Sequence, residues 1–434
     1  MSPVKSWPLM VGGPAGEATA LMRQRYLVGT KLLETLSRGL FVLVCTYRLS
    51  LEEAGRFGLL ATVIGLLSFG LGFERQIDMQ RQIAGRSSLA IRRRMADTLR
   101  FFRAHYLLVL PISMLAATLA GVSAWPLTLA TVVVIGEHLS NQAYQAVLLN
   151  QRAFPLLVAA SAKNSLQLLA VLYLSWREPE ALTALSILQV WALASISYVA
   201  IAATWWGLWI REPLLQQGDE LPAQTLSEQY RASALHFLVG LVAVAALQVD
   251  RLVVGGALSA AEVGIYFRNV ALAGLALQIF NIASFNRVAP GVYQHARERT
   301  WQRGAEVVKV EYLRFALVFT GLVVLALLIN HYSGYPAHRF GLQTLFVLIM
   351  TAGVLLRTAA DYKGLLLLSL GGDQELFRNQ ATAVVLGAAG LFLLALAYHL
   401  PGAFLGAMLT PMIYFLLNRL SVQRRYGQLE TSLP

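Results

Sequence analysis

The sequence predicts an all-α polytopic membrane protein with twelve transmembrane helices arranged as two lobes of six. Three observations predict this fold class. The chain of 434 residues is 57% hydrophobic and only 13% charged, with a mean hydropathy of +0.58, which is more apolar surface than a soluble domain can bury. Apolar segments of membrane-spanning length recur along the chain. The loops between these segments alternate in charge.

The apolar segments are each about 20 residues long, which is enough to cross a hydrocarbon core of roughly 30 Å. We number the predicted helices one to twelve in chain order. They lie at residues 27–47, 54–72, 101–121, 126–149, 155–175, 184–209, 233–256, 263–290, 311–330, 341–366, 379–399 and 402–420.

The distribution of basic residues predicts the orientation of the helices. The loop after helix two carries eight arginines between Arg75 and Arg103, and the loop after helix eight carries four basic residues between Arg297 and Lys309. The loops after helices three, seven and eleven carry no Lys or Arg. Because basic loops stay in the cytoplasm, we expect both termini on the cytoplasmic side.

The polar stretch at residues 211–230 separates the two sets of six helices. We therefore expect five regions along the chain. They are a cytoplasmic N-terminal arm at 1–25, an N-lobe at 26–210, a cytoplasmic linker at 211–230, a C-lobe at 231–421 and a cytoplasmic tail at 422–434.

An internal sequence repeat supports the division into two lobes. Residues 49–57 read LSLEEAGRF and residues 258–266 read LSAAEVGIY, so Leu, Ser, Glu, Gly and an aromatic residue recur 209 positions later. Each copy lies at the turn between the first two helices of a lobe. With six helices in each lobe, the two repeats would run parallel about an axis along the membrane normal.

Helix one carries three charges, Lys31, Glu34 and Arg38, which fall within about 60° of one another around the helix axis. Charges at membrane depth are costly, so this face should meet protein or water instead of lipid. A local pair between Lys31 and Glu34 would satisfy two of the charges and leave Arg38 unexplained.

Helices four and five also carry polar residues. Helix four places Glu137, Asn141 and Tyr144 on one face, with His138 about 100° away. Helix five carries Lys163. These residues are candidates for a polar interior.

The second lobe has its own intramembrane charges. Asp250 and Arg251 are adjacent in helix seven and so point about 100° apart, and helix eight carries Arg268. The sequence does not say which of Asp250 and Arg251 faces the interior. Arg357 and Asp361 lie four residues apart in helix ten and can neutralise each other.

Cations outnumber acids among these residues, so the predicted interior is net positive. Because the planar guanidinium matches phosphate oxygens, the pattern favours an anionic ligand, and amide and aromatic residues would suit a sugar. The acids are alternative candidates for ion coupling. The candidate substrate-binding residues are Lys31, Arg38, Arg251, Arg268, Lys163, Arg357, Asn141 and Tyr144, and the candidate ion-coupling residues are Glu34, Glu137, Asp250 and Asp361.

The sequence contains no signature of an enzyme, a cofactor site or a metal site. It has no HExxH motif and no P-loop, and its single cysteine, Cys45, excludes an intramolecular disulfide. The net charge of +12 comes from basic residues concentrated between apolar segments, which is typical of membrane orientation. We therefore expect a protein that is not an enzyme and that has no nucleic-acid partner.

The chain resembles the polysaccharide transport family of the multidrug/oligosaccharidyl-lipid/polysaccharide (MOP) exporter superfamily, in particular the Wzx-type O-antigen flippases. The resemblance rests on the two six-helix halves, on LSLEEAGRFGLL at the first turn, and on the stretch from Asp250 through VVGGALSAAEVGIYFRN to Pro290. It implies two bundles around a central cavity that opens alternately to either side. Peptidoglycan-lipid flippases of the superfamily typically have fourteen helices, so twelve argues against that branch.

The resemblance also implies a substrate and a location. The family moves an undecaprenyl-pyrophosphate-linked glycan from the cytoplasmic to the periplasmic leaflet of the bacterial inner membrane, during lipopolysaccharide or polysaccharide biosynthesis. Basic cavity residues would meet the pyrophosphate, a role that transfers to Lys31, Arg38, Arg251 and Arg268. The implied partners are this lipid-linked glycan, the lipid bilayer and other glycan-assembly membrane proteins.

Two alternatives stay open. One is a drug or metabolite antiporter of the same superfamily, whose cavity for cations should be net acidic. The other is a polytopic glycan polymerase or ligase. Such enzymes usually work through a substantial periplasmic loop, whereas every predicted outside loop here is short.

Overall fold

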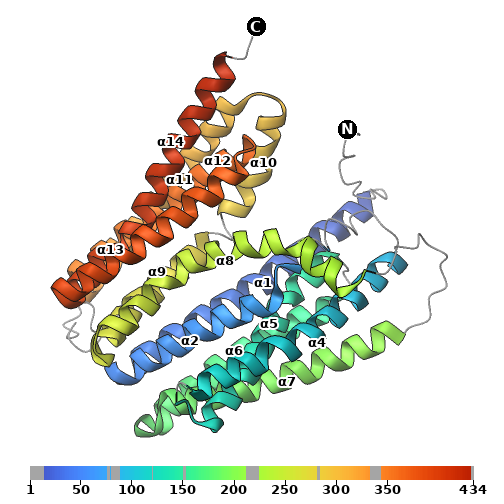
Figure 1. The fold of residues 1–434 in the computed structure, drawn as a ribbon, viewed down its shortest axis with the longest axis vertical. Helices are drawn as coiled ribbons and strands as arrows, with labels where there is room; N and C mark the ends of the chain where they lie inside the picture. The colour runs from blue at the N-terminus through green and yellow to red at the C-terminus, as the bar shows by residue number, and fades with distance from the viewer. Residues whose placement is uncertain are drawn as a thin grey trace. The chain divides into compact units, whose positions relative to one another are not determined.

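The computed structural model describes residues 14–75, 79, 88–119, 121–149, 153–211, 224–280, 284–332 and 344–431, and all of its regular structure in these ranges is helical (Figure 1). Twelve helices in the described ranges are long. They are α1 (Pro14–Arg48), α2 (Leu51–Gly72), α4 (Ser88–Leu119), α5 (Ala124–Leu149), α6 (Phe154–Arg177), α7 (Ala184–Arg211), α8 (Leu226–Ala257), α9 (Ala260–Phe280), α11 (Trp301–Tyr332), α12 (Thr344–Ser369), α13 (Asp373–Ala407) and α14 (Leu409–Thr431). Two short elements, η2 (Pro179–Ala181) and α10 (Asn286–Arg297), lie between them.

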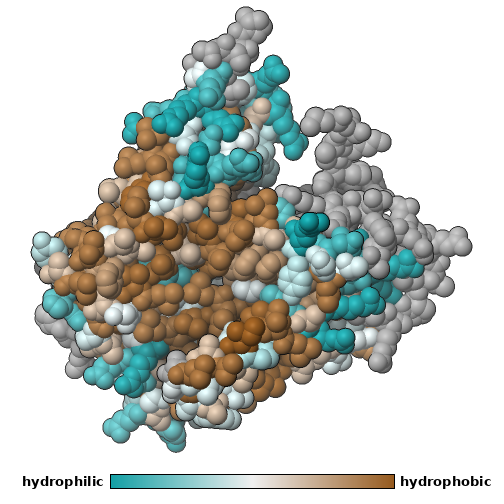
Figure 2. Space-filling model, in the orientation of Figure 1, coloured by the Kyte–Doolittle hydropathy of each residue, from teal (hydrophilic) through white to brown (hydrophobic). Residues whose placement is uncertain are grey.

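The helices have the length and surface of membrane spans. Eight stretches of the described residues are long and apolar enough to cross a bilayer, and one of them, Asp373–Gln428, contains α13 and most of α14. Large apolar side chains face outward, with Leu107 73% exposed and Leu317 75% exposed. Much of the surface visible in Figure 2 is hydrophobic. The prediction of an all-α, multi-pass membrane protein is confirmed.

The predicted helix eight, at residues 263–290, is wrong in extent. The corresponding helix α9 ends at Phe280, residues 281–283 lie outside the described ranges, and α10 begins at Asn286 and contains Pro290. The sequence prediction followed apolar content, which continues across this break. Apolar content alone cannot distinguish one long helix from two helices with different directions, because both can bury the same residues.

The first helix is longer than predicted. Helix α1 begins at Pro14, inside the stretch expected to be the N-terminal arm. Proline is favoured at the first position of a helix because the amide that it lacks would have no intrahelical partner there. Most of the predicted linker, residues 212–223, lies outside the described ranges.

Helix α13 contains a break that separates the predicted helices eleven and twelve. His399 adopts φ 51° and ψ −134°, and Pro401 follows it. A Cβ built on Gly406 would meet the Cα of Leu391, so the segments on either side of the break pack closely against each other. The chain therefore turns back on itself at His399.

The chain divides into two compact units, which we describe separately. The first unit comprises residues 1–41, 67–174 and 185–238, and the second comprises residues 42–66, 175–184 and 239–434. The core of the first unit includes Leu157, Ala160 and Tyr198, and a core of the second includes Val254 and Phe404. Helices α1, α2, α6, α7 and α8 contribute residues to both units.

The two copies of the repeated turn have the same local structure. Each begins a helix with the capping-box pattern Ser-x-x-Glu. Ser50 accepts a hydrogen bond from the Glu53 amide at 3.3 Å. Ser259 accepts one from the Glu262 amide at 3.4 Å and donates to the Glu262 carboxylate at 2.6 Å. The repeat in the sequence is thus also a repeat of helix starts.

Replacing Ser259 with alanine should lower the stability of the protein by about 1 kcal/mol, because the α9 amides lose their cap. The melting temperature of the purified protein in detergent should fall by a few degrees. Ser197→Ala is a suitable control, since the Ser197 hydroxyl is exposed and donates only to the Leu193 carbonyl of its own helix. Equal melting temperatures for the two variants would contradict this role of Ser259.

Candidate substrate-binding site

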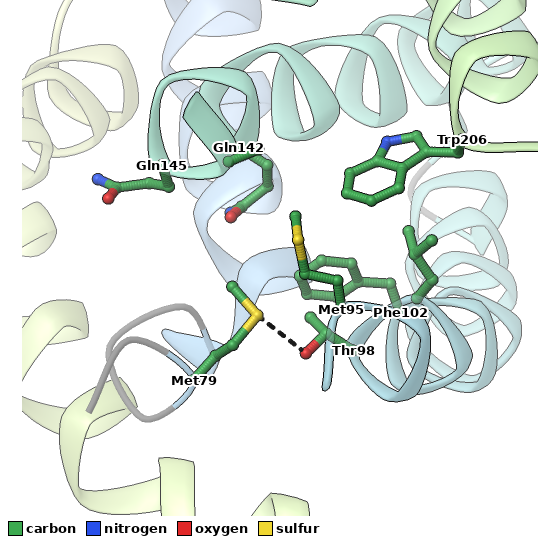
Figure 3. Close-up of a pocket in the computed structure, with 9 residues that line it drawn as sticks. Met79, Met95, Thr98, Phe102, Gln142, Gln145 and Trp206 are labelled. Atoms are coloured by element: carbon green, nitrogen blue, oxygen red, sulfur yellow. Dashed lines mark hydrogen bonds between the residues drawn. The ribbon is translucent and has the colours of Figure 1, made fainter. Parts of the chain in front are cut away.

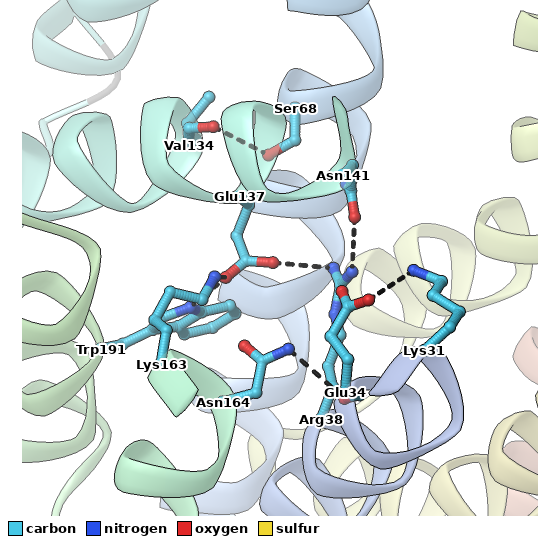
Figure 4. Close-up of polar contacts among 10 residues, drawn as sticks. All are labelled: Lys31, Glu34, Arg38, Ser68, Val134, Glu137, Asn141, Lys163, Asn164 and Trp191. Atoms are coloured by element: carbon cyan, nitrogen blue, oxygen red, sulfur yellow. Dashed lines mark hydrogen bonds and ion pairs between the residues drawn. The ribbon is translucent and has the colours of Figure 1, made fainter. Parts of the chain in front are cut away.

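A buried cluster of charges lies in the first unit and is centred on Glu137 of α5. The Glu137 side chain is 2% exposed. Its Oε1 accepts hydrogen bonds from Lys163 Nζ at 2.5 Å and from Trp191 Nε1 at 2.9 Å, and its Oε2 lies 3.2 Å from Arg38 Nη2 (Figure 4). Helices α1, α6 and α7 therefore each contribute a donor to one carboxylate. These contacts give the Glu137 carboxylate three donors within a largely apolar bundle.

The charged face of α1 completes the cluster. Lys31 Nζ lies 2.6 Å from Glu34 Oε2, which is the local pair that the sequence suggested. Arg38, which this pair leaves out, donates from Nη1 to Asn141 Oδ1 at 3.1 Å in addition to pairing with Glu137. This face of α1 therefore packs against Glu137 and Asn141 of α5.

The face of α5 that carries Glu137, Asn141 and Tyr144 meets these α1 residues. Lys31 Nζ lies 5.2 Å from the centre of the Tyr144 ring, within cation–π range. Seven of the residues named from the sequence therefore come together in one place. We call them the α1–α5–α6 charge cluster; they are Lys31, Glu34, Arg38, Glu137, Asn141, Tyr144 and Lys163.

Only two charged members of the cluster reach its surface. The side chains of Lys163, Glu137 and Glu34 are 1%, 2% and 3% exposed, whereas those of Lys31 and Arg38 are 25% and 35% exposed. The buried part of the cluster consists of the two carboxylates, Glu34 and Glu137, and the Lys163 ammonium group. The accessible part consists of one ammonium group and one guanidinium group.

The charges of the cluster do not cancel. Its three cations and two carboxylates leave one excess positive charge. An uncompensated charge in a low-dielectric site attracts a counter-ion strongly, and here the two accessible groups are both cationic. A planar guanidinium beside an ammonium suits a phosphate-type anion, and Asn141 and Tyr144 add polar and aromatic contacts beside them.

Sequence reasoning missed the contribution of α7. Trp191 donates to Glu137, and Tyr198 lies two turns further along with its ring centre 5.8 Å from Lys163 Nζ. A Cβ built on Gly136 would meet Ser195, so this glycine allows α5 and α7 to approach closely. The i, i+4, i+7 spacing of Trp191, Ser195 and Tyr198 is the signal that could have identified this face.

Asp250 and Arg251 lie in the second unit. Asp250 Oδ2 accepts a hydrogen bond from the Tyr266 hydroxyl at 2.6 Å. Arg251 donates from Nη1 to Gln248 Oε1 at 2.6 Å, and its guanidinium lies 5.9 Å from the centre of the Phe267 ring. Arg251 thus pairs with a neutral amide.

Arg268 has the contacts of a residue that caps a helix. It is 5% exposed, and it donates from Nε to the Thr46 carbonyl and from Nη2 to the Leu49 carbonyl, both at 2.8 Å. These carbonyls belong to the C-terminal end of α1, where a cation is stabilised by the helix dipole. The geometry thus favours a structural role for Arg268 over contact with substrate.

Arg357 and Asp361 of α12 pair with each other, with Nε 3.1 Å from Oδ1. The Arg357 guanidinium also lies 5.3 Å from the centre of the Tyr414 ring. This pair is electrically neutral, as the i, i+4 spacing suggested. It therefore adds no net charge to the second unit.

An apolar pocket also lies in the first unit (Figure 3). Met79, Met95, Phe102 and Trp206 line it, and Met79 Sδ accepts a hydrogen bond from Thr98 at 3.3 Å. None of the described residues that line this pocket is charged. It does not suit an anion, so the α1–α5–α6 charge cluster is the better candidate for a charged headgroup.

The fold is similar to that of several solved transporters. An inward-facing multidrug-resistance MATE family transporter of the MOP superfamily superposes with a TM-score of 0.69 and 14% identity, over 92% of this chain and 96% of the other. The lipid II flippase MurJ, in an inward closed conformation, superposes with a TM-score of 0.66 and 12% identity, over 95% and 93% of the two chains.

A third similar structure is a MOP superfamily transporter from Pyrococcus furiosus, for which a reversed polarity of the binding pocket was taken to suggest a different function. It superposes with a TM-score of 0.56 and 14% identity, over 96% of this chain and 97% of the other. No family model and no curated protein matches the sequence. The three similar structures are transporters or a flippase and not enzymes. The chain thus has the same fold as these three structures.

Proposed function

We propose that this protein is a flippase that carries an undecaprenyl-pyrophosphate-linked oligosaccharide or polysaccharide repeat unit from the cytoplasmic to the periplasmic leaflet of a bacterial inner membrane by alternating access. The observation that supports it best is the excess positive charge of the α1–α5–α6 charge cluster, with Arg38 and Lys31 accessible. Similarity to the fold of a lipid II flippase supports a lipid-linked substrate.

The proposed binding mode assigns separate roles to the members of the cluster. Arg38 and Lys31 hold the phosphate oxygens, and Asn141 and Tyr144 contact the first sugar. Glu137 and Lys163 hold Arg38 in place, since Glu137 accepts from both. Arg251 is a second basic candidate, and the polyprenyl tail stays in the lipid. The proposal includes the orientation expected from the sequence, with lobes at 26–210 and 231–421 and both termini in the cytoplasm.

Binding of the substrate should depend on the shape of the Arg38 side chain as well as on its charge. Arg38→Gln should weaken binding of an undecaprenyl-pyrophosphate oligosaccharide to the purified protein in nanodiscs by at least about tenfold, because a charge-assisted hydrogen bond is lost. Arg38→Lys should recover only part of the affinity, since lysine keeps the charge without the planar fork. Tryptophan fluorescence or a labelled oligosaccharide can report the binding.

Arg314→Gln is the matched control, since Arg314 is 70% exposed and pairs with Glu311 of its own helix. If Arg38→Gln binds as tightly as Arg314→Gln, the cluster does not hold the substrate. Competition separates the proposal from a drug antiporter: pyrophosphate should displace the lipid-linked glycan, whereas displacement by organic cations alone would favour the antiporter. In cells, deletion of the gene should cause the lipid-linked glycan to accumulate on the cytoplasmic leaflet.

A further inference from the structure

The two repeated turns pack against each other in the second unit, and their contact has internal two-fold symmetry. A Cβ built on Gly55 of α2 would meet the Ala260 carbonyl and the Gly264 amide, and one built on Gly264 of α9 would meet the Leu51 carbonyl and the Gly55 amide. Gly55 and Gly264 are equivalent positions of the repeat, 209 residues apart, and so are Leu51 and Ala260. Exchanging the repeats therefore maps the contact onto itself.

The next turn of each helix continues this close approach. Gly58 and Phe267 are also equivalent positions, and a Cβ on Gly58 would fall against the Phe267 ring. On α8, a Cβ on Gly255 would meet the side chain of Leu59. Helices α2, α8 and α9 thus meet at glycines, where backbones can approach more closely than side chains would allow.

Each side of the contact satisfies its own helix-start amides. Ser50 caps the Glu53 amide within α2, and Ser259 and Glu262 form a reciprocal capping box within α9. Glu53 also accepts a hydrogen bond from the Ala184 amide at 2.7 Å, which ties α2 to α7 of the same predicted lobe. Separation of α2 from α9 would therefore leave the capped amides of both turns paired.

Arg268 forms hydrogen bonds across the contact. It belongs to the second repeat, and the two carbonyls that it binds, those of Thr46 and Leu49, precede the turn of the first repeat. Both acceptor residues are buried, at 0% and 2% exposed. When the contact opens, water can hydrogen-bond to both the Arg268 guanidinium and the two carbonyls. While the contact is closed, these groups are buried, so breaking their hydrogen bonds costs free energy.

We propose that the Gly55–Gly264 contact is a closure that separates during the conformational cycle, and that Arg268 is the latch that holds it shut. The Ser50 and Ser259 caps act within their own helices, the backbones of α2 and α9 meet at Gly55 and Gly264, and the two Arg268 hydrogen bonds cross the contact and break on opening. This inference rests on the alternating-access part of the proposed function. It does not depend on the identity of the substrate.

A cysteine pair can test the closure without any substrate. In a Cys45→Ala background, the pair is Gly58→Cys with Phe267→Cys. Because a Cβ on Gly58 would touch the Phe267 ring, the two positions face each other at short range across the contact, as a disulfide requires. A protease site within residues 212–223 lies between the two cysteines in the sequence. On a non-reducing gel, the cross-linked protein therefore stays as one band after cleavage. After reduction of the disulfide it separates into two bands.

The informative measurement is the rate at which a water-soluble maleimide labels the reduced pair in nanodiscs. We expect slow labelling of the reduced protein, since the thiols are reached only when the closure opens, and none of the oxidised protein. Adding Arg268→Met should increase the labelling rate roughly tenfold, because charge-assisted hydrogen bonds no longer hold the closed state. Arg268→Lys should fall between the two.

Arg425→Met is the control for removing an arginine, because Arg425 donates to the Leu370 carbonyl and pairs with Glu375 but lies on α14. It should leave the labelling rate unchanged. Absence of the disulfide under oxidation would mean that the contact does not exist. Labelling no faster than global unfolding, or an unchanged rate in both Arg268 variants, would show a static contact and overturn the latch. A protein that opens in this way but binds no lipid-linked pyrophosphate would contradict only the flippase.

Discussion

Replacing Lys163 with methionine is expected to destabilise the protein by about 3–5 kcal/mol, the cost of removing one partner from a buried ion pair. The Lys163 and Glu137 side chains are 1% and 2% exposed and their charged atoms lie 2.5 Å apart. Without Lys163, Glu137 would retain only Arg38 and Trp191 as donors. Thermal unfolding in detergent, followed by tryptophan fluorescence, measures the loss.

The double variant Lys163→Met/Glu137→Gln should recover much of that stability, because it removes the unpaired charge as well. It also keeps the cluster at one excess positive charge, so binding of the substrate can be compared at constant net charge. Lys31→Met is the control for removing a lysine, since Lys31 is 25% exposed and solvent screens its pair with Glu34. A double variant no more stable than Lys163→Met alone would show that the pair is not coupled as the structure indicates.

The sequence predicted the members of this cluster but not how they connect. Helical periodicity was sufficient to place Lys31, Glu34 and Arg38 on one face and Glu137 and Asn141 on another, because the 3.6-residue repeat fixes directions around a single helix. Which faces meet depends on the packing of helices that are far apart in sequence. The period of one helix carries no information about its neighbour.

Residues on polar faces were easier to predict than those on mostly apolar ones. The indole of Trp191 binds Glu137, yet no residue of the predicted helix six was a candidate in the sequence. Arg268 shows the converse case. An intramembrane arginine was taken for a ligand-binding residue, whereas its donors bind carbonyls at the end of α1, and backbone acceptors cannot be recognised from side-chain patterns.

Helix boundaries were limited by the kind of signal used. Apolar content identifies the part of a helix that lies in the membrane, so it missed the polar start of α1 at Pro14 and the change from α9 to α10 after Phe280. The repeated turn was predicted from the amino-acid sequence alone. Its self-contact at Gly55 and Gly264 required the structure, since many membrane-helix glycines have open space beside them.

Gly264→Ala is expected to force α2 and α9 apart. The added methyl group would overlap the Leu51 carbonyl, which is backbone and cannot rotate away as a side chain can. Overpacking of this kind typically costs about 1–3 kcal/mol, and the lack of a movable neighbour places this site at the upper end. The yield of the disulfide between cysteines at 58 and 267 should fall with it, which the cleavage assay measures.

Gly256→Ala of α8 is the matched control, because nothing lies within 4 Å of a Cβ at that position. By the symmetry of the contact, Gly55→Ala should have nearly the same effect as Gly264→Ala. The double variant should cost less than the sum of the two, since the first methyl group already separates the backbones that the second would strike. Additive effects would mean that the two glycines act at independent contacts, and the closure would then lose its basis in the repeat.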